Sequence, residues 1–231
     1  MDEKEAEKIN ANGEQLGNLE IASNPARDFW EFFIDLLKTG IVVFIIAFTL
    51  RYFVVQPYIV DGESMMPNYQ NREYLLAEKV SYYRGSPKRG DVVIFKYPKN
   101  PSVNYIKRII GLPGEKVEIE DNTITIFNSK HATGTILSEE YIPKSTLTLT
   151  PNNSLLNMTL KENEYFVLGD NREHSSDSRE WGVLPSANIL GRSWLTLTPL
   201  DLAGFHSRIT YPNLSKSISN PLAIMEARSG Q

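Results

Sequence analysis

The 231-residue sequence contains no cysteine and only three histidines. Without a thiol, the chain can form no disulfide, no thiolate nucleophile and no cysteine-type zinc site. The histidines His131, His174 and His206 lie far apart and show no H-x-x-x-H spacing. We therefore expect neither a metal site nor any other cofactor.

The sequence also lacks a basic run. It has 24 Lys and Arg against 28 Asp and Glu, which gives a formal net charge of −4. The first 28 residues hold seven acids and three bases and so account for the whole excess. No basic surplus remains that would favour a nucleic acid as partner. Residues 1–28 are polar without an apolar period, and we interpret them as a flexible acidic tail.

One long apolar stretch follows this tail. From residue 36 to residue 55, 20 residues contain only Lys38 and Arg51 as charges. At ~1.5 Å per residue this length crosses ~30 Å of hydrocarbon. The uncharged part has only 12 residues, which is typical of a buried core helix. Because apolar residues surround the helix and both charges lie near its ends, we interpret residues 29–57 as one transmembrane helix that Pro57 ends.

Beyond Pro57, short β-type runs alternate with turn residues, so the sequence predicts a mainly β domain over residues 58–198. The predicted strands are residues 58–60, 74–79, 91–97, 104–111, 116–120, 123–127, 165–168 and 191–197. Residues 128–163 are rich in Ser, Thr, Asn and Pro, and we interpret them as a small inserted lobe or long loop. Residues 199–231 show no clear period and are interpreted as a C-terminal surface tail.

Ser64 lies in the stretch VDGESMMPNY, where a strand ends. A serine beside Gly and Asp is common in turns, so this stretch alone indicates ordinary turn chemistry. A serine in such a loop can also project its hydroxyl as a nucleophile. Other stretches of the chain decide between the two.

Lys107 lies in the stretch YIKRIIGLPGE. Strand alternation places Lys107 on one face and Arg108 on the other, with apolar neighbours on both. An ion pair explains most lysines in strands. Burial would instead lower the lysine pKa from its reference value of ~10.4, because desolvation penalises the charged form. A lysine that is neutral near neutral pH can accept a proton from a serine hydroxyl.

The stretch GDNREHSSDSREWG over residues 169–182 is densely polar, and a solvated loop is its simplest interpretation. The spacing of its charges favours instead an ion-paired, hydrogen-bonded brace that orders a catalytic strand. The brace residues are Asp170, Arg172, Asp177 and Arg179, with Ser175 and Ser178 as further donors and acceptors.

The motifs ESMMP, RGDVVIF, YIKRIIGLPGE and GDNREHSSDSREWG, in this order after one apolar helix, resemble the type I bacterial signal peptidases, or leader peptidases. The resemblance covers about residues 36–198. One motif alone is a weak signal, whereas four in the family's order are highly specific. The resemblance implies a signal-peptidase-like β-sheet catalytic domain.

The resemblance also implies roles for particular residues. Ser64 matches the nucleophile and Lys107 the general base of a Ser/Lys dyad. Ser175 matches the serine whose hydroxyl orients the lysine amine. Asp177 and Arg179 match a structural ion pair behind the dyad.

Two positions depart from the family pattern. Gly62 replaces the serine or threonine whose hydroxyl helps oxyanion stabilisation in some members, and Asn68 replaces threonine after the proline. We expect the backbone N–H of Ser64 to stabilise the oxyanion.

Asp170 and Arg172 match loop residues beside the dyad. The residues that the resemblance implies for shallow apolar substrate pockets are Tyr58, Val60, Met65, Tyr105 and Ile106.

The implied activity is removal of N-terminal signal peptides from exported preproteins by a membrane-bound serine endopeptidase, through an acyl-enzyme. The implied substrates carry small residues at their −1 and −3 positions. We expect a single-pass protein of the bacterial cell membrane, with a cytoplasmic N-terminus and an extracytoplasmic catalytic domain. It would act as a monomer near the secretion machinery, with the lipid bilayer as a second partner.

Three alternatives stay open at this point. The first alternative is a serine nucleophile activated by a histidine base. The sequence lacks the nucleophile elbow G-x-S-x-G that would indicate such a serine. A self-cleaving repressor would share the Ser/Lys chemistry but would need a DNA-binding module where this chain has a hydrophobic helix. A membrane-anchored β-rich binding domain that has lost catalysis would lack the serine or the lysine, and both are present.

Overall fold

The computed structural model describes residues 25–151 and 154–215. The chain divides into two compact units between Leu50 and Arg51. The first contains a long helix, and the second, the β unit, contains the strands. Each unit is described by itself.

The first unit is built on helix α2 (Pro25–Thr49), which a π-helical turn (Leu50–Val54) follows along the chain. This run of 30 residues has a mean hydropathy of 2.2 in its most apolar window. By length and composition it can cross a membrane, and the described residues contain no second helix of this kind.

The bounds of this helix differ from the predicted ones. It begins at Pro25 rather than at residue 29, and the helical run ends at Val54. Pro57 lies in strand β1 (Val55–Ile59), so it does not end the helix as predicted. Proline lacks the N–H that an inner strand must donate, and β1 lies at the edge of its sheet, where proline is tolerated.

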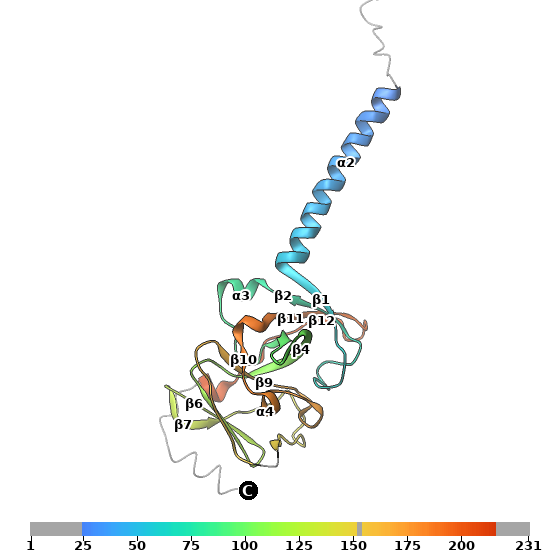
Figure 1. Cartoon of the computed structure of the whole chain (residues 1–231). Helices are drawn as coiled ribbons and strands as arrows, with labels where there is room; N and C mark the ends of the chain where they lie inside the picture. The colour runs from blue at the N-terminus through green and yellow to red at the C-terminus, as the bar shows by residue number, and fades with distance from the viewer. Residues whose placement is uncertain (1–24, 152–153, 216–231) are drawn as a thin grey trace, which may run out of the picture. The chain divides into compact units, whose positions relative to one another are not determined.

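An eight-stranded antiparallel sheet forms the larger part of the β unit (Figure 1). Its strands run in the order β1-β2-β11-β3-β4-β9-β10, and β12 pairs with β11. Their remaining bounds are β2 (Tyr74–Glu78), β3 (Val92–Tyr97), β4 (Asn100–Gly111), β9 (Glu164–Leu168), β10 (Leu184–Pro185), β11 (Ile189–Thr198) and β12 (Gly204–Phe205). The predicted strands in this region are confirmed, with ends shifted by a few residues.

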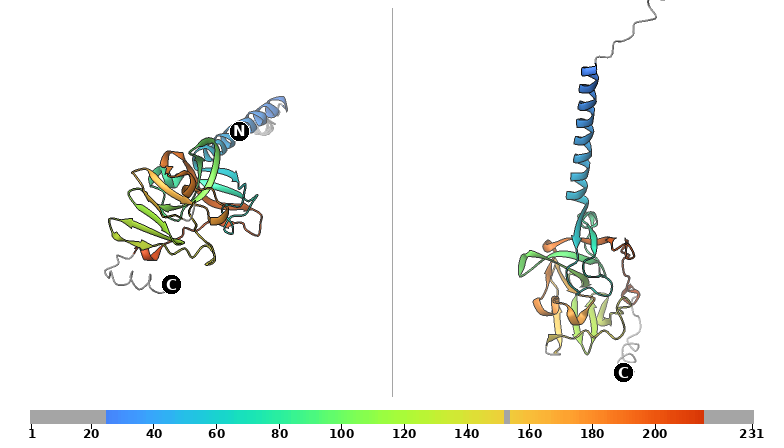
Figure 2. Two further views of the ribbon diagram at one scale, coloured as in Figure 1. Left: turned by 60° about the horizontal axis from the view of Figure 1, so that its bottom comes forward. Right: turned by 90° about the vertical axis from the view of Figure 1, so that its right-hand side faces the viewer.

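A four-stranded antiparallel sheet in the order β7-β6-β5-β8 forms the smaller part and lies to one side of the larger sheet (Figure 2). Its strands are β5 (Lys116–Glu120), β6 (Thr123–Asn128), β7 (His131–Ile136) and β8 (Leu156–Thr159). Strands β7 and β8 fall in residues 128–163, where the sequence indicated no strand. Their polar composition, HATGTI and LNMT, hides the alternation that would reveal them.

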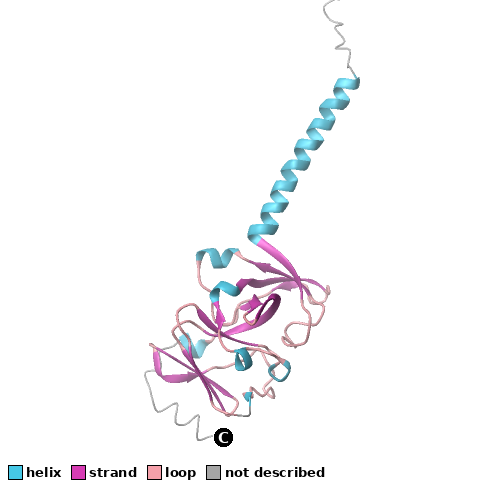
Figure 3. Ribbon diagram, in the orientation of Figure 1, coloured by secondary structure: helices cyan, strands magenta, loops and turns pink. Residues whose placement is uncertain are grey.

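Helices in the β unit are short (Figure 3). They are α3 (Val80–Arg84), α4 (Ser178–Trp181) and α5 (Pro212–Ser215), with 3₁₀ turns η3 (Arg172–His174) and η4 (Ser186–Asn188). Strands and loops therefore carry most of the core and of the functional side chains.

Strand β4 lies in the middle of the core. Ile109 packs with Val167 of β9 in one apolar cluster, and Ile110 packs against Val117 and Ile126 of the smaller sheet in another. All five side chains are fully buried, each worth roughly 1.5–3 kcal/mol relative to exposure. The two clusters on β4 hold its C-terminal half rigidly, as predicted for a strand buried on both faces.

The described part of the predicted C-terminal tail belongs to the β unit, which corrects the sequence interpretation. Tyr211 is 7% exposed and packs in the cluster that contains Ile110. Arg208 forms an ion pair with Asp91 at 2.9 Å. Irregular backbone that packs through single side chains has no period to detect. The other parts of the predicted tails, residues 1–24 and 216–231, lie outside the described residues.

Candidate active site

Ser64 lies in a closed loop between β1 and β2. The Val60 N–H donates to the Glu73 carbonyl at 2.9 Å and so joins the two ends of the loop. Met65 is 1% exposed and anchors the loop in an apolar cluster beneath it. The Ser64 side chain is therefore presented half-buried from a loop that is fixed on both sides.

The Lys107 amine meets this serine. Its Nζ donates to Ser64 Oγ at 2.7 Å and to the Ile106 carbonyl at 3.0 Å. Lys107 is 4% exposed and forms no ion pair in the part of the chain that the structure describes. The sequence expectation that these two side chains meet is thus met by the geometry, and none of the three histidines is hydrogen-bonded to Ser64 among the described residues.

The environment of this lysine favours the neutral amine. Burial lowers the pKa of Lys107 to about 8 from its usual 10.5, while Asp177 and Asp170 act to raise it. Arginines bind both carboxylates, Arg179 at Asp177 and Arg108 at Asp170, each with a nitrogen at 2.8 Å. These ion pairs limit the field of the carboxylates at the amine. An amine with such a pKa can accept a proton from a hydroxyl near neutral pH.

Asp177 and Arg179 form the ion pair that the sequence indicated. Arg179 donates Nε and Nη2 to the two carboxylate oxygens of Asp177 at 2.8 Å each. The Asp177 side chain is fully buried and also accepts from the Gly169 N–H at 3.1 Å. It caps helix α4 through the Arg179 N–H. The pair therefore holds the two ends of the loop 169–181 together.

Asp170 and Arg172 take partners that the sequence interpretation did not identify. Arg108 binds Asp170 through Nε at 2.8 Å and through Nη2, and Arg172 binds Glu139 through Nη1 at 2.7 Å and through Nη2. Arg108 is next to Lys107 in a strand that the sequence predicts to be buried. Because a buried arginine needs a carboxylate partner, such a partner for Arg108 could have been predicted. Glu139 lies in an irregular segment and gave no such signal.

Ser175 lies beside the dyad without binding it. Its hydroxyl is buried and has no hydrogen-bond partner among the described residues, so the expected bond to the lysine amine is not formed. A Cβ on Gly169 would lie 2.1 Å from Ser175 Oγ and 2.4 Å from the Ser64 carbonyl oxygen. Only glycine lets the loop backbone pass between the two serines.

A cleft of about 410 Å³ opens at Ser64 and Lys107. Four of the residues expected to line substrate pockets do line it: Tyr58, Val60, Tyr105 and Ile106. Met65 does not, because its side chain turns into the core, where it is 1% exposed. Residues that the sequence interpretation missed in this cleft are Leu75, Ile94, Val103, His174 and Ser176.

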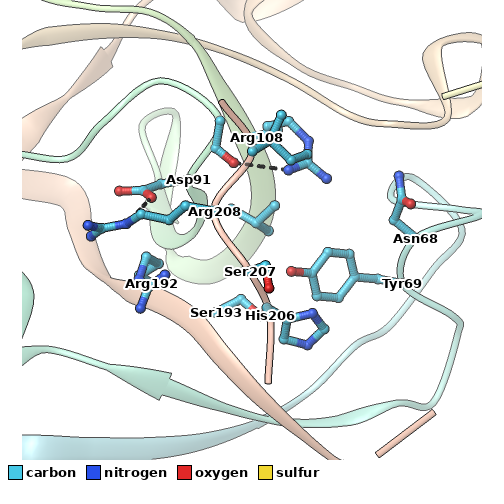
Figure 4. Close-up of a pocket in the computed structure, with 12 residues that line it drawn as sticks. Asn68, Tyr69, Asp91, Arg108, Arg192, Ser193, His206, Ser207 and Arg208 are labelled. Atoms are coloured by element: carbon cyan, nitrogen blue, oxygen red, sulfur yellow. Dashed lines mark hydrogen bonds and ion pairs between the residues drawn. The ribbon is translucent and has the colours of Figure 1, made fainter. Parts of the chain in front are cut away.

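A second cavity, of about 160 Å³, contains neither Ser64 nor Lys107 (Figure 4). Three arginines line it, Arg108, Arg192 and Arg208. A carboxylate already binds each of them: Asp170, Glu78 and Asp91 respectively. Figure 4 shows the Arg208–Asp91 pair and the bond of Arg108 within this cavity. The positive charges of this cavity are therefore neutralised by carboxylates of the chain itself.

Comparisons with known proteins agree with the resemblance that the four sequence motifs indicate. A family model described as "Signal peptidase, peptidase S26" matches residues 33–198. "Probable signal peptidase I-1" of Synechocystis sp. (strain ATCC 27184 / PCC 6803 / Kazusa) is 31% identical over 196 residues, which cover 82% of this chain and 94% of that protein. "Signal peptidase I P" of Bacillus subtilis subsp. natto is 36% identical over 176 residues, 73% of this chain and 90% of that protein. A crystal structure of a signal peptidase I from Enterococcus faecalis V583 matches at 33% identity and a TM-score of 0.37, over 47% of this chain and 97% of that one.

Proposed function

The chain belongs to the signal peptidase, peptidase S26, family, and we propose that it removes signal peptides from exported preproteins with Ser64 as nucleophile and Lys107 as general base. The observation that carries this assignment is the 2.7 Å hydrogen bond from Lys107 Nζ to Ser64 Oγ. The lowered pKa of the lysine supports it, because a base must be neutral before it can accept the proton.

The reaction has two acyl-transfer steps. Lys107 takes the proton of the Ser64 hydroxyl as Oγ attacks the scissile carbonyl, and the lysine then protonates the leaving amine of the mature protein. A water molecule deprotonated by the same amine hydrolyses the ester and restores the serine. The Ser64 N–H stabilises the oxyanion, because Gly62 has no side chain that could donate a hydrogen bond to it.

The cleft supports a preference for small side chains. The cleft at Ser64 is lined by Tyr58, Val60, Tyr105 and Ile106, and we infer that these residues form shallow apolar pockets. Preproteins with small residues at −1 and −3 fit such pockets, whereas larger side chains would collide with the walls. The charged motif residues support the loop beside the dyad: Asp177 and Arg179, with Asp170 and Arg172. Among the described residues, the Ser175 hydroxyl forms no hydrogen bond to the dyad.

Helix α2 supports attachment to the bacterial cell membrane as a single-pass anchor. We place the N-terminus in the cytoplasm and the β unit outside it, because preproteins are cut after they have crossed the membrane. In this arrangement the chain acts as a monomer near the secretion machinery. Protease protection in membrane vesicles tests the orientation: an accessible N-terminus in right-side-out vesicles would reverse it.

The test of the activity is cleavage of a model precursor by the full chain in detergent. Wild type should release the signal peptide after the small −1 residue, whereas Ser64→Ala and Lys107→Ala should not. Lys116→Ala is a matched control. Lys116 is a lysine of the smaller sheet that forms an ion pair with Glu118 and lies over the Phe127 ring, and it is not among the residues that line the cleft. Cleavage by either dyad variant at the wild-type rate would contradict the assignment.

A further inference from the structure

The irregular segment 137–150, here called the crossing segment, has no helix or strand and was given no role by the sequence (Figure 3). It nevertheless binds the loop 169–181 at three arginine contacts. Arg172 binds Glu139 and Thr148, and Arg179 donates Nη1 to the Leu149 carbonyl at 2.8 Å. The segment is therefore an outer support of the loop that contacts the nucleophile.

Of these three contacts, the one with Glu139 is an ion pair. Arg172 Nη1 lies 2.7 Å from its carboxylate, and Nη2 forms a second bond to it. The Arg172 side chain is 0% exposed and that of Glu139 11%. Among the described residues, Glu139 is the one carboxylate that forms an ion pair with Arg172. A guanidinium this buried depends on its counter-ion for a fixed position.

Arg172 connects Glu139 to the backbone that contacts Ser64. Its Nε donates to the Gly169 carbonyl at 3.1 Å. The Gly169 backbone touches the nucleophile, since a Cβ there would lie 2.4 Å from the Ser64 carbonyl oxygen. The Asn171 N–H donates to that same oxygen at 3.1 Å. A shift of Arg172 therefore moves backbone that is in direct contact with Ser64.

Tyr141 reinforces the same connection. Its hydroxyl donates to Glu139, and the Arg108 guanidinium lies 4.2 Å from the centre of its ring. Its carbonyl accepts from Asn68 Nδ2 at 2.9 Å, and the same amide donates to Asp170 at 2.8 Å. Asn68 lies in the loop between β1 and β2 that carries Ser64. The crossing segment is therefore connected to this loop both through Asn68 and through Arg172.

We propose that Glu139 is a positioning residue for the Ser64–Lys107 pair, acting through Arg172 and Gly169 with Tyr141 as its support. This inference rests on the proposed function, because it assigns Glu139 to that reaction. Without the carboxylate the loop 169–181 shifts, the hydroxyl and the amine separate, and water reaches Lys107. Catalysis should fall, while the cleft walls outside this loop, such as Tyr58, Tyr105 and Ile106, keep their places.

Glu139→Gln tests this inference, and Glu115→Gln is its matched control. Glu115 also binds a buried arginine: Arg89 Nη2 lies 2.6 Å from its carboxylate, and its side chain is 8% exposed. It neither lines the cleft nor contacts the loop 169–181. Both variants should unfold at lower temperature, so the two are compared where circular dichroism shows both folded.

In Glu139→Gln we expect kcat on the model precursor to fall about tenfold or more, with KM within about twofold of wild type. The acid limb of its pH profile should move to higher pH as water raises the pKa of Lys107. Glu115→Gln should keep kcat within about twofold and the acid limb in place. Wild-type kcat and pH profile in Glu139→Gln, or equal losses in both variants, would overturn the inference.

A second readout separates this inference from the proposed function. A small activated ester acylates a reactive serine, and intact-protein mass spectrometry measures the rate without any precursor. If wild type is acylated at Ser64 but cuts no precursor, the proposed function fails, and the ratio of acylation rates in the two variants still decides the role of Glu139. If wild type is not acylated, both fail.

Tyr141→Phe serves if Glu139→Gln does not fold. It keeps the ring over Arg108 and removes only the hydroxyl, which donates to Glu139 and accepts from Arg172 Nη2 at 3.3 Å. We expect acylation of Ser64 to slow by about threefold in this variant. An unchanged rate would contradict the role of the crossing segment.

Discussion

The two sheets of the β unit bury different kinds of side chain. The smaller sheet fills its interior with apolar residues such as Val117, Ile119 and Ile126. The larger sheet buries Lys107 and Arg108 on its inner strand β4, where each is 4% exposed. Burial of apolar groups stabilises a fold directly, whereas buried charges cost stability unless they are paired. Of these two charges, Lys107 has no carboxylate paired with it among the described residues, so its burial costs stability that the proposed reaction would explain.

Lys107 and Arg108 show this contrast again between neighbours. Arg108 has a bidentate carboxylate partner in Asp170; burial acts to lower its pKa, but the carboxylate prevails and the pKa is raised. Lys107 has no such partner, and burial lowers its pKa to about 8. One strand thus carries a paired, permanently charged guanidinium and a weakly basic amine that suits the proposed role of general base.

The largest expected effect is that of replacing the amine of Lys107 by a group that stays charged. Lys107→Arg should reduce kcat/KM by about 10³-fold or more, as Lys107→Ala does, because a guanidinium is not deprotonated near neutral pH. Precursor cleavage measures it. Activity above about a tenth of wild type would remove the lysine from the role of base and would end the contrast with Arg108.

A change of pH should reproduce part of this loss in the wild type. Because the pKa of Lys107 is about 8, kcat/KM should fall about tenfold for each pH unit below that value and level off above it. A rate that stays flat down to pH 4 would contradict this. The unfolding free energy should rise between pH 8 and pH 10.5, where the unfolded lysine binds a proton that the folded one has lost.

A smaller effect on activity is expected when an ion pair of the larger sheet is broken. Arg179→Ala leaves the fully buried Asp177 unpaired, which should lower the unfolding free energy by about 3–5 kcal/mol. The uncompensated carboxylate should also raise the pKa of Lys107 and reduce activity at pH 7 by about tenfold.

Thermal unfolding of the full chain in detergent and the pH profile measure the two effects of Arg179→Ala. Lys116→Ala is the control from the smaller sheet, since it breaks the more exposed pair with Glu118 and should cost less than about 1 kcal/mol. If Arg179→Ala were as stable and as active as this control, the loop 169–181 would be an ordinary solvated loop.

The smallest effect on activity is expected from the apolar interior of the smaller sheet. Ile126 is 0% exposed, so Ile126→Ala should lower the unfolding free energy by about 2–5 kcal/mol. Its kcat, measured where circular dichroism shows the variant folded, should remain within about twofold of wild type. A larger loss of kcat would mean that the two sheets are not functionally separate.

Local patterns were sufficient to predict most of the fold. Alternating Val and Ile around the turn Asp121-Asn122 predicted β5 and β6 within one residue of their observed ends. Strands β7 and β8 escaped notice because their residues are polar and their runs short. Arg208 and Tyr211 pack as single side chains on irregular backbone, and such packing leaves no period in a sequence.

In the candidate site, too, some features could be predicted from the sequence and others could not. Residues of the motif stretches, such as Asp177 and Arg179, pair with each other across two positions and could be matched by spacing. Glu139 binds Arg172 across 33 positions, and Met65 turns into the core rather than into the cleft. Neither side-chain direction nor distant pairing follows from local composition.

The sequence by itself determined that this chain has one long apolar helix, a mainly β unit and four motifs in the order of the signal peptidases. These are properties of neighbouring residues, which composition and spacing express directly. Only the tertiary structure decided that Ser64 and Lys107, 43 positions apart, touch at 2.7 Å, and that burial lowers the pKa of the amine to about 8. Both depend on which distant segments pack together, since contact and desolvation arise from the whole fold and not from any stretch of it.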